Sequence, residues 1–327
     1  MNVTLPTIEQ AAARLQGVAV RTPLLQSAEL DARTGARVLL KAENLQHIGA
    51  FKFRGAFNRL CQLNEQVRAR GVVAFSSGNH AQGVAFAAKR LNIPANIVMP
   101  DDAPMIKLEG TRRLGASVRL YRRHHESREQ IAAELAEKTG AALVPAFDDP
   151  FIINGQGTIG LELMEQSQVL ARRPDILLVP CGGGGLLAGV ATAINGINQQ
   201  TAVYGVEPET YDDHWQSHRA GKRVKIDGTT PTLCDALMAT SPGELTWSIN
   251  HELVSDYLRV SEDEVRHAIS FAFRYLKLVV EPGGAVALAA LLQGKLAFSG
   301  KICSLIISGG NIDASVFAEC LNRFPEP

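Results

Sequence analysis

The sequence has no excess of charge of either sign. It contains 33 Lys and Arg residues and 33 Asp and Glu residues, so its formal net charge is +0. Proteins that bind nucleic acid or an anionic membrane surface usually carry a basic excess, so neither partner is expected. No repeat occurs at a fixed period, which argues against a solenoid. The 327 residues, 46% of them hydrophobic, suffice for one elaborate domain or two lobes.

Close cysteine pairs and long apolar runs are also missing. The cysteines are odd in number, and none forms a CxxC pair: Cys61, Cys181, Cys234, Cys303 and Cys320. Such thiols are typical of a reduced, cytosolic protein. The N-terminus MNVTLPTIEQ lacks the pattern of a secretory signal, and glycines or polar residues interrupt each apolar stretch before it reaches spanning length. We therefore expect a cytoplasmic protein without a membrane segment.

What the sequence does contain is a regular alternation of apolar runs and helical patterns between residues 71 and 147. It predicts strands at 72–75, 95–99, 117–121 and 143–147, and helices from His80 to Leu91, at 103–114 and at 127–139. Strands separated by single helices indicate right-handed crossovers and a parallel sheet.

The rest of the chain repeats this alternation on a larger scale. Helices are expected at 6–15, near Ser27, and at 54–63, 155–166, 185–197, 262–275, 284–292 and 312–322, and strands at 38–41, 175–180, 202–206 and 302–307. Thr7 is the expected N-cap of the first helix, with Gln10 completing a capping box. Residues 208–250 are polar and turn-rich, so they are expected to be mostly irregular. The pattern predicts two α/β lobes with a cleft between them.

One lysine stands between two aromatic residues in the segment Gly49-Ala50-Phe51-Lys52-Phe53-Arg54-Gly55-Ala56. Desolvation by such neighbours lowers the pKa of a lysine and makes its amine nucleophilic enough to hold an aldehyde. Alternatively, Lys52 is a residue at the edge of the core whose ammonium group reaches solvent. The lysine segment alone does not decide between these alternatives.

A run of four glycines, Gly182 to Gly185, joins a predicted buried strand to a predicted helix. Consecutive glycines can turn successive N–H groups inward, and the dipole of the following helix favours an anion there. A merely flexible turn is the alternative. The stretch matches neither GxxxxGK[ST] nor a clean GxGxxG, so a small phosphorylated cofactor fits better than a nucleotide.

Two further polar segments end predicted strands. Ser76-Ser77-Gly78-Asn79-His80 opens a helix and suits recognition of a carboxylate, although an ordinary N-cap would look similar. Ser308-Gly309-Gly310-Asn311 ends the last strand, where the hydroxyl can meet a ring nitrogen; alone it is a turn. A reactive lysine, a phosphate cradle and a partner for a ring nitrogen together specify pyridoxal phosphate.

These motifs, together with VEPE and EPGGA and in this order over nearly the whole chain, resemble the fold type II pyridoxal-phosphate enzymes. The serine/threonine dehydratase and serine racemase branch is the most similar. The resemblance implies an α/β, two-lobed parallel-sheet architecture like that of the tryptophan synthase β chain. It also implies a large cofactor-binding domain formed by residues 1–64 and 150–327, and a small substrate-binding domain formed by residues 65–149. A homodimer is the usual assembly in this family and is expected here.

The resemblance further implies a role for each matching position. Lys52 would form the internal aldimine and Phe51 would pack on the pyridine ring. Ser77 would handle the proton on the face opposite the lysine, as in the racemases. The other cofactor contacts implied are Asn79 to the phenolic oxygen, Gly182, Gly183, Gly184, Gly185 and Leu186 to the phosphate, and Ser308 to the ring nitrogen. The substrate carboxylate would bind at Ser76, Ser77, Asn79 and His80, with Arg128 assisting.

Serine racemase-like members of the family also bind a divalent cation through two carboxylates and a backbone carbonyl. Glu207, Tyr211 and Asp213 match that spacing, and their oxygen donors suit Mg²⁺, Mn²⁺ or Ca²⁺. Acidic residues in a solvated turn are the alternative. The bulky Tyr211 stands where small residues are usual, which makes the geometry of the site less certain.

The implied activity is β-elimination. An L-β-hydroxy amino acid, of the serine, threonine, 3-hydroxyaspartate or phenylserine type, would lose its hydroxyl and then ammonia to give a 2-oxo acid. Ala50 stands where many dehydratases have Ser or Thr, and the same alanine is familiar from 3-hydroxyaspartate dehydratases and some racemases. The alternatives are a racemase that uses Lys52 and Ser77 on opposite faces, a β-replacement enzyme of the cysteine synthase type, and a non-catalytic sensor of a phosphorylated ligand. The chain stops soon after SGGN, so a C-terminal regulatory domain of the threonine deaminase type is not expected.

Overall fold

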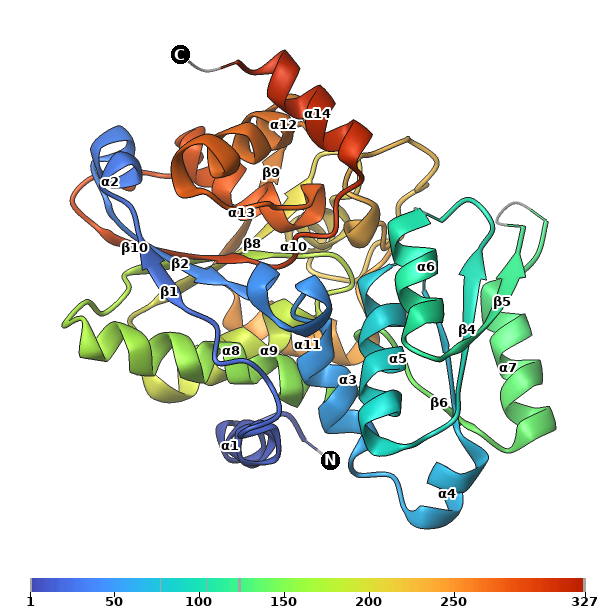
Figure 1. Ribbon diagram of the computed structural model, residues 1–327. Coiled ribbons are helices and arrows are strands. Elements are labelled where there is room, and N and C mark those ends of the chain that lie inside the picture. Colours follow the sequence, from blue (N-terminus) through green and yellow to red (C-terminus); the bar gives the residue numbers. More distant parts are fainter. Residues whose placement is uncertain (1, 77, 104, 123–124, 326–327) are drawn as a thin grey trace.

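The computed structural model describes residues 2–76, 78–103, 105–122 and 125–325. Two sheets organise these residues (Figure 1): a large sheet in the order β1-β2-β10-β7-β8-β9 and a small sheet in the order β5-β4-β3-β6. All strand pairs are parallel except β1 with β2. The predicted two-lobed α/β architecture is therefore confirmed.

The strands have the following bounds: β1 Leu24–Gln26, β2 Arg37–Ala42, β3 Val72–Phe75, β4 Ala95–Pro100, β5 Ser117–Tyr121, β6 Ala142–Leu143, β7 Ile176–Pro180, β8 Ala202–Pro208, β9 Asp256–Val260 and β10 Ile302–Ile307. The edge strands β1 and β9 were not predicted, because they are short and carry polar residues. Every small-sheet strand lies within residues 65–149 and every large-sheet strand lies outside that range. The domain boundaries themselves remain a prediction.

The α-helices have the following bounds: α1 Leu5–Leu15, α2 Ala28–Thr34, α3 Lys52–Leu60, α4 Glu65–Arg70, α5 Asn79–Leu91, α6 Met105–Arg113, α7 Arg128–Thr139, α8 Pro150–Val169, α9 Gly185–Ile197, α10 Asp213–Ala220, α11 Glu244–Leu253, α12 Glu262–Phe271, α13 Pro282–Leu292 and α14 Ala314–Arg323. Short 3-10 segments are η1 Glu43–Leu45, η2 His47–Gly49 and η3 Asp235–Leu237, and the π-helical segment η4 Ala272–Leu276 continues α12.

Alternate residues of each central strand face opposite layers, as the period of a strand requires. In β7, Leu177 and Val179 pack with α8 and α9, whereas Ile176 and Leu178 pack with α12 and α13. The large sheet is thus covered on both faces (Figure 1). In the small sheet, Val73 packs toward α7 and its neighbours in β3 pack toward α5. This burial on both faces explains why the strands read as continuous apolar runs.

Several predicted element boundaries were wrong. The first helix begins one residue earlier than expected, and its N-cap is Thr4, not Thr7; Thr7 completes the capping box in place of Gln10. The predicted helix at 262–275 keeps α-helical hydrogen bonds only to Phe271 and then continues as η4. The π-helical segment ends at Lys277, which has a left-handed φ of 59°.

Residues 208–250 are mostly irregular, as expected, but they include α10 and the first part of α11, which were not predicted. The carboxylate of Glu207 accepts hydrogen bonds from the backbone of His214 (3.0 Å) and Trp215 (2.8 Å) at the start of α10. Asp148, almost a hundred residues away, accepts from the first backbone N–H groups of α11. These capping carboxylates come from outside the helices they cap, so the local sequence carries no start signal.

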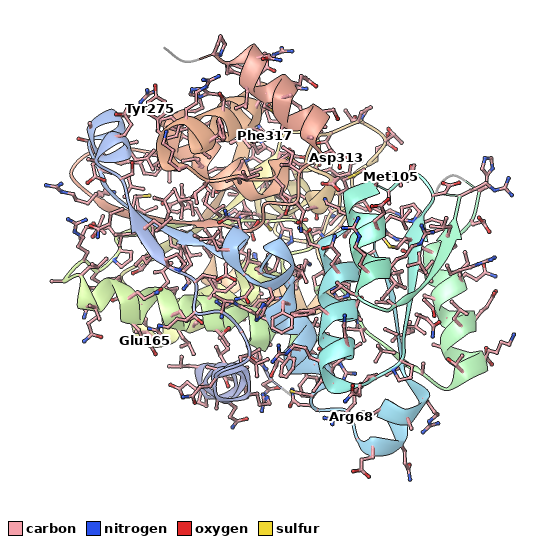
Figure 2. All side chains as sticks on the ribbon, in the orientation of Figure 1. Arg68, Met105, Glu165, Tyr275, Asp313 and Phe317 are labelled. Carbon is pink, nitrogen blue, oxygen red and sulfur yellow. The ribbon has the colours of Figure 1, made fainter. Side chains whose placement is uncertain are left out.

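None of the helices in the described ranges has the length and apolar character needed to cross a membrane. Some charged side chains lie at the periphery, as Figure 2 shows for Glu165 on the outer side of α8. Glu165 forms an ion pair with Arg21 at 2.8 Å, with both side chains more than half exposed.

Candidate active site

The lysine segment is attached to the C-terminal end of β10. Ala50 forms an isolated bridge with Gly309, and the backbone N–H of Phe51 donates to the carbonyl of Ser308 at 3.1 Å. Lys52 then opens α3. Two segments that lie about 250 residues apart in the sequence therefore meet at one edge of the large sheet, where open α/β sheets bind ligands.

Among the described residues, no carboxylate is in direct contact with the amine of Lys52. Its Nζ donates to the carbonyl of Ala146 at 2.9 Å and lies 5.1 Å from the centre of the Phe51 ring. Burial lowers the pKa of Lys52 to about 8, against a smaller opposing effect of Glu281. A lysine with this pKa is neutral in a substantial fraction at physiological pH, so it can act as a nucleophile or base.

The glycine run leads from β7 into α9. Gly184 has φ = 90°, a conformation that side-chain-bearing residues rarely adopt, and it directly precedes the helix. Thr246 donates from Oγ1 to the carbonyl of Gly183 at 2.8 Å, and Asn250 donates from Nδ2 to the carbonyl of Gly184 at 3.3 Å. With these carbonyls held by α11, the loop is fixed rather than flexible, as a phosphate cradle at a helix N-terminus requires.

The segment from Ser76 to His80 connects β3 to α5. The backbone N–H of Gly78 donates to the Ser76 hydroxyl at 3.1 Å. Ser77 lies outside the described residues. Among the described residues, the backbone N–H groups of Asn79 and His80 have no hydrogen-bond acceptor, so the start of α5 presents donors of the kind that bind a carboxylate.

The imidazole of His80 is neutral. Its Nε2 lies 3.0 Å from the carbonyl of Val144, which can only accept, so Nε2 carries the hydrogen. Burial and the nearby Lys52 lower the pKa of His80 to about 3, although the Val144 carbonyl opposes this. The side chain of His80 therefore brings no positive charge to the site, and its backbone N–H is what it offers to a carboxylate.

The side chain of Asn79 joins the small sheet to the large one. Its Nδ2 donates to Glu281 through a short hydrogen bond, and its Oδ1 accepts from Nδ2 of Asn311 at 2.9 Å. Asn311 belongs to the SGGN segment after β10, and Glu281 is the N-cap of α13. Three motifs recognised in the sequence thus meet at this asparagine.

Ser308 and Arg128, two other predicted site residues, lie in different surroundings. Ser308 is 5% exposed at the end of β10, and its Oγ has no hydrogen-bond partner among the described residues. Arg128 opens α7, pairs with Glu129 at 2.8 Å, and lies over the ring of Phe75, the last residue of β3 before Ser76. Its side chain is 41% exposed, and its part in substrate binding stays a prediction.

The linker from Val144 to Asp149 is the part of the site that the sequence did not indicate. The predicted strand at 143–147 was wrong, since β6 ends at Leu143. Instead the carbonyls of Val144 and Ala146 accept from His80 and Lys52. The ring of Phe147 lies so close to Gly183 that a Cβ atom there would approach it to 2.4 Å. The only local sequence feature that could have indicated this linker is the acidic pair Asp148-Asp149 before Pro150.

The proposed cation ligands Glu207 and Asp213 are both buried, and the charge of Asp213 acts on Glu207. Burial raises the pKa of Asp213 to about 8, and burial together with Asp213 raises the pKa of Glu207. Neither carboxylate oxygen of Asp213 has a hydrogen-bond partner among the described residues. Two buried carboxyls, one of them unpartnered, fit a hard divalent cation. A complete site needs the Tyr211 carbonyl, because no group of three metal-binding side chains occurs in the described ranges.

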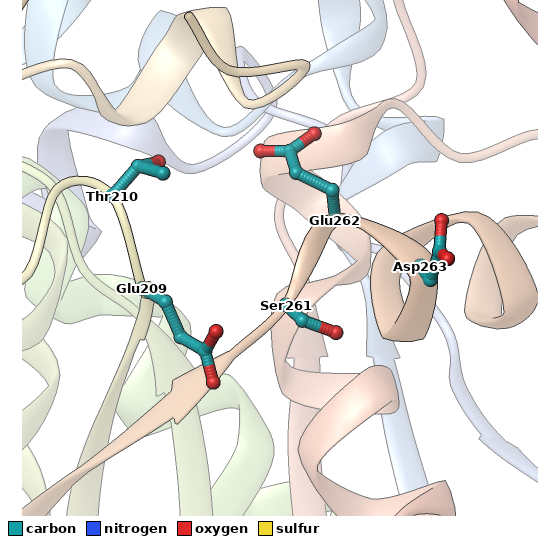
Figure 3. Close-up of a pocket in the computed structure, with 5 residues that line it drawn as sticks. All are labelled: Glu209, Thr210, Ser261, Glu262 and Asp263. Carbon is teal, nitrogen blue, oxygen red and sulfur yellow. The ribbon is translucent and has the colours of Figure 1, made fainter. Parts of the chain in front are cut away.

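A separate hollow of about 360 Å³ lies after β8 and β9 and is lined by Glu209, Thr210, Ser261, Glu262 and Asp263 (Figure 3). Two of its three acidic side chains have partners: Glu262 accepts from Thr232 and from the backbone of Leu233, and Asp263 pairs with arginines of α12 and α14. It contains no lysine and none of the predicted site residues, so the chemistry lies elsewhere.

Comparison with known proteins identifies the family of the chain. A model of the family described as "Pyridoxal-phosphate dependent enzyme" matches residues 15–309. The chain is 47% identical over 312 residues to an L-threo-3-hydroxyaspartate ammonia-lyase of a Pseudomonas species, covering 95% of this chain and 96% of that protein. It is 43% identical over 325 residues to a serine racemase of Schizosaccharomyces pombe, covering 98% and 99%.

A solved structure gives the same result in three dimensions. The crystal structure of a T.th. threonine deaminase superposes with a TM-score of 0.89 at 43% sequence identity, covering 95% of this chain and 99% of that chain. The match extends over both sheets, so the relative is similar in its whole architecture and not in one lobe alone.

Proposed function

The chain belongs to the pyridoxal-phosphate dependent enzymes, within their serine/threonine dehydratase group, and on that basis we propose that it is a dehydratase. It would convert an L-β-hydroxy amino acid to a 2-oxo acid and ammonia. The observation that carries the proposal is the position of Lys52, a buried amine with a lowered pKa. It donates to the carbonyl of Ala146, whose neighbour Phe147 packs on the glycine loop, and its charge acts on His80 at the start of α5.

The cofactor would be held by groups already in position. Its phosphate would lie against the backbone N–H groups from Gly182 to Leu186, where the positive end of the α9 dipole favours it. Phe51 would pack on the ring. Asn79 would donate to the phenolic oxygen, and the unpartnered hydroxyl of Ser308 would meet the ring nitrogen. When bound, pyridoxal phosphate would supply an aldehyde for Lys52 and an acceptor for the electrons released at the substrate Cα.

The reaction would then depend on where the chain holds protons. The substrate carboxylate would bind at the start of α5, which orients the Cα proton toward Lys52. The neutral amine of Lys52 would remove that proton, and its hydrogen bond to Ala146 would keep the lone pair directed into the site. Because burial raises the free energy of the charged ammonium, Lys52 would readily give the proton up again.

The relatives narrow the substrate class. The proteins most similar to this chain include an L-threo-3-hydroxyaspartate ammonia-lyase and a threonine deaminase. We therefore propose β-hydroxy amino acids with a small or acidic β-substituent as substrates. Ala50, buried beside the lysine, leaves more room than a Ser or Thr would at this position.

Racemisation is the second candidate, because the serine racemase of Schizosaccharomyces pombe matches the chain over almost its full length. Lys52 and Ser77 would then act on opposite faces of the substrate. Ser77→Ala distinguishes the two activities: loss of racemisation in one direction, with dehydration largely kept, would assign Ser77 as the second base. Equal losses in both activities would argue against that role.

We also propose that Glu207, Asp213 and the carbonyl of Tyr211 hold a divalent cation. Without one, the raised pKa of Asp213 favours the folded protein at low pH, and this contribution is lost as the pH rises through about 8. In EDTA, the melting temperature should therefore fall over that range, and Mg²⁺, Mn²⁺ or Ca²⁺ should restore it. An Asp213→Asn variant should lose the response to the cation; an unchanged response would place the cation elsewhere.

The assembly and location remain proposals as well. We propose a homodimer, supported by Phe273, which is 41% exposed and packs edge-to-face on Phe317, and by Val279, which is 46% exposed on the same part of the chain. Sedimentation of the purified protein at micromolar concentration tests this, and a monomer would refute it. We propose a cytoplasmic location because Cys61, Cys181, Cys234, Cys303 and Cys320 are free thiols, as is typical of a reducing compartment.

The deciding experiment measures 2-oxo acid and ammonia release from L-serine, L-threonine, L-threo-3-hydroxyaspartate and L-threo-phenylserine, with and without EDTA. Release from at least one of them, and its loss in Lys52→Ala, would establish the dehydratase. A wild-type protein that binds pyridoxal phosphate yet releases no 2-oxo acid would refute it and favour racemisation or β-replacement.

A further inference from the structure

Lys107 crosses from the small sheet to the large one. It lies on α6, yet its Nζ is 2.6 Å from a carboxylate oxygen of Asp235 and 3.4 Å from one of Glu281, both of which belong to segments packed on the large sheet. The residue is 1% exposed. Burial lowers the pKa of Lys107, but the two carboxylates outweigh it and raise the pKa overall, so the ammonium is charged.

Glu281 connects this ammonium to the predicted cofactor contact. One oxygen of its carboxylate faces Lys107 and the other accepts from Nδ2 of Asn79. Burial raises the pKa of Glu281, and Lys107 is the largest influence that opposes this. Lys107 therefore favours the ionised form of Glu281, which can only accept hydrogen bonds.

An ionised Glu281 determines which way the amide of Asn79 points. A carboxylate cannot donate, so it requires the NH₂ end of the amide to face it. Asn311 sets the other end, because its Nδ2 donates to Oδ1 of Asn79 and also to the carbonyl of Ile48 at 2.8 Å. With both ends fixed, the second N–H of Asn79 has no acceptor among the described residues and is left for a ligand.

We propose that Lys107 and Glu281 are positioning residues for Asn79: they hold its second amide N–H in place for the phenolic oxygen of the cofactor, and they do so only while the small sheet is docked on the large one. The proposal rests on the proposed binding of pyridoxal phosphate, not on the identity of the substrate. If the proposal holds, the absorption and affinity of the bound cofactor depend on contact between the two sheets.

A purely structural role of Lys107 predicts a different result for its substitution. If Lys107 only stabilised the packing of the two sheets, its loss would lower stability and leave the bound cofactor unchanged. If it also sets the amide of Asn79, its loss should change the cofactor in the same way as loss of the Glu281 charge. A neutral or protonated side chain at 281 can donate as well as accept, and so no longer selects one amide orientation.

The experiment uses Lys107→Met, Glu281→Gln and the double variant, with Arg113→Met as the matched control. Arg113 lies on the same helix but is 79% exposed and pairs only with Glu109. The readouts are the visible absorption band of the bound cofactor and the dissociation constant for pyridoxal phosphate, with urea denaturation to record stability. No substrate is needed, so the result does not depend on the dehydratase activity.

Lys107→Met and Glu281→Gln should shift the cofactor band in the same direction and weaken binding about tenfold each, as loss of one hydrogen bond to a charged group implies. The double variant should bind no more weakly than either single variant, because the residues act in one chain. Arg113→Met should keep the wild-type band and affinity.

A folded Lys107→Met variant with the wild-type band and affinity would overturn the proposal, as would additive losses in the double variant. If Lys107→Met does not fold, Glu281→Gln and Asp235→Asn decide. Asp235 is partly exposed and does not contact Asn79, so its variant should keep the band while Glu281→Gln shifts it. A Glu281→Gln variant without a shift would refute the role of Glu281. If the wild-type protein does not bind the cofactor at all, the proposed function fails first, and the two failures remain distinguishable.

Discussion

Lys52 and Lys107 are two lysines removed from solvent that have opposite properties. Burial is the largest influence on the pKa of each, and in both cases it lowers the pKa. Lys107 has two carboxylates beside its ammonium, and its pKa ends above the ordinary value. Lys52 has only a backbone carbonyl as its hydrogen-bond partner, and its pKa falls to about 8. Since both lysines are buried, the two carboxylates beside Lys107 account for the difference in pKa between them.

Lys41 is a third case and belongs with Lys107. Its Nζ lies 2.6 Å from a carboxylate oxygen of Glu162 and also donates to Gln166 and to the carbonyl of Thr22. Burial nevertheless lowers its pKa, because it outweighs the attraction of the single contacting carboxylate. Its amine is therefore fully used by structural partners, and we expect no chemistry from it.

The largest expected effect comes from removing the reactive amine. Lys52→Ala should lower turnover by about 10³-fold or more, since both the covalent attachment and the proton transfer are lost. The visible absorption of the attached cofactor should disappear while the far-ultraviolet circular dichroism stays as in the wild type. Turnover that survives in this variant would show that Lys52 is not the reactive lysine.

Removing a structural lysine should have the opposite outcome. Lys41→Met should lower the free energy of unfolding by about 3 kcal/mol, at the low end for a broken buried ion pair because Glu162 keeps Arg54 as a partner. Cofactor absorbance and turnover of the folded fraction should remain. Urea denaturation measures the loss of free energy of unfolding. A Lys41→Met variant that is stable but inactive would show that Lys41, like Lys52, takes part in the chemistry.

The difference in pKa should be visible directly in the cofactor-free protein. The rate at which it takes up pyridoxal phosphate should rise with pH and level off, with a midpoint near pH 8, because only the neutral amine attacks the aldehyde. An ordinary exposed lysine would still be gaining reactivity at that pH. A midpoint near that of an exposed lysine would mean that Lys52 is not desolvated.

The smallest expected effect sharpens the comparison, because Glu281 acts on both lysines. It acts to raise the pKa of both Lys107 and Lys52. In Glu281→Gln, the midpoint of cofactor uptake should therefore move to lower pH, since an attraction that favours the charged amine of Lys52 is lost. The rate of cofactor uptake by this variant, measured as a function of pH, tests this prediction. A midpoint that moves to higher pH would contradict the assigned influence of Glu281.

Much of the site was open to prediction because its parts lie where strands end and helices begin. The glycine run, the segment from Ser76 to Asn79 and the segment from Ser308 to Asn311 each follow a strand recognised by its apolar run. Parallel strands place their carboxyl ends at one edge, so strand recognition alone was enough to bring such motifs together. The assignment of Arg128 had no such support, and its contacts in the structure lie with Glu129 and Phe75.

The linker from Val144 to Asp149 shows where this reasoning stops. Its apolar residues resemble a strand, but its carbonyls accept from His80 and Lys52 and its Phe147 packs on the glycine loop. These partners come from distant parts of the chain. A pattern of local hydrophobicity contains no information about them, because it records burial and not the group against which a residue is buried.

The sequence by itself determined the alternation of strands and helices and the two-lobed architecture, since both depend on local periodicity, and a contiguous motif marked Lys52 as the candidate reactive lysine. Only the tertiary structure decided that, among the described residues, Lys107 has two contacting carboxylates and Lys52 has none. It also supplied the distant carboxylates that cap α10 and α11 and the chain of contacts from Lys107 to Asn79. The physical reason is that pKa values and amide orientations depend on charges within a few ångströms in space, and folding brings those charges together from residues far apart in the sequence.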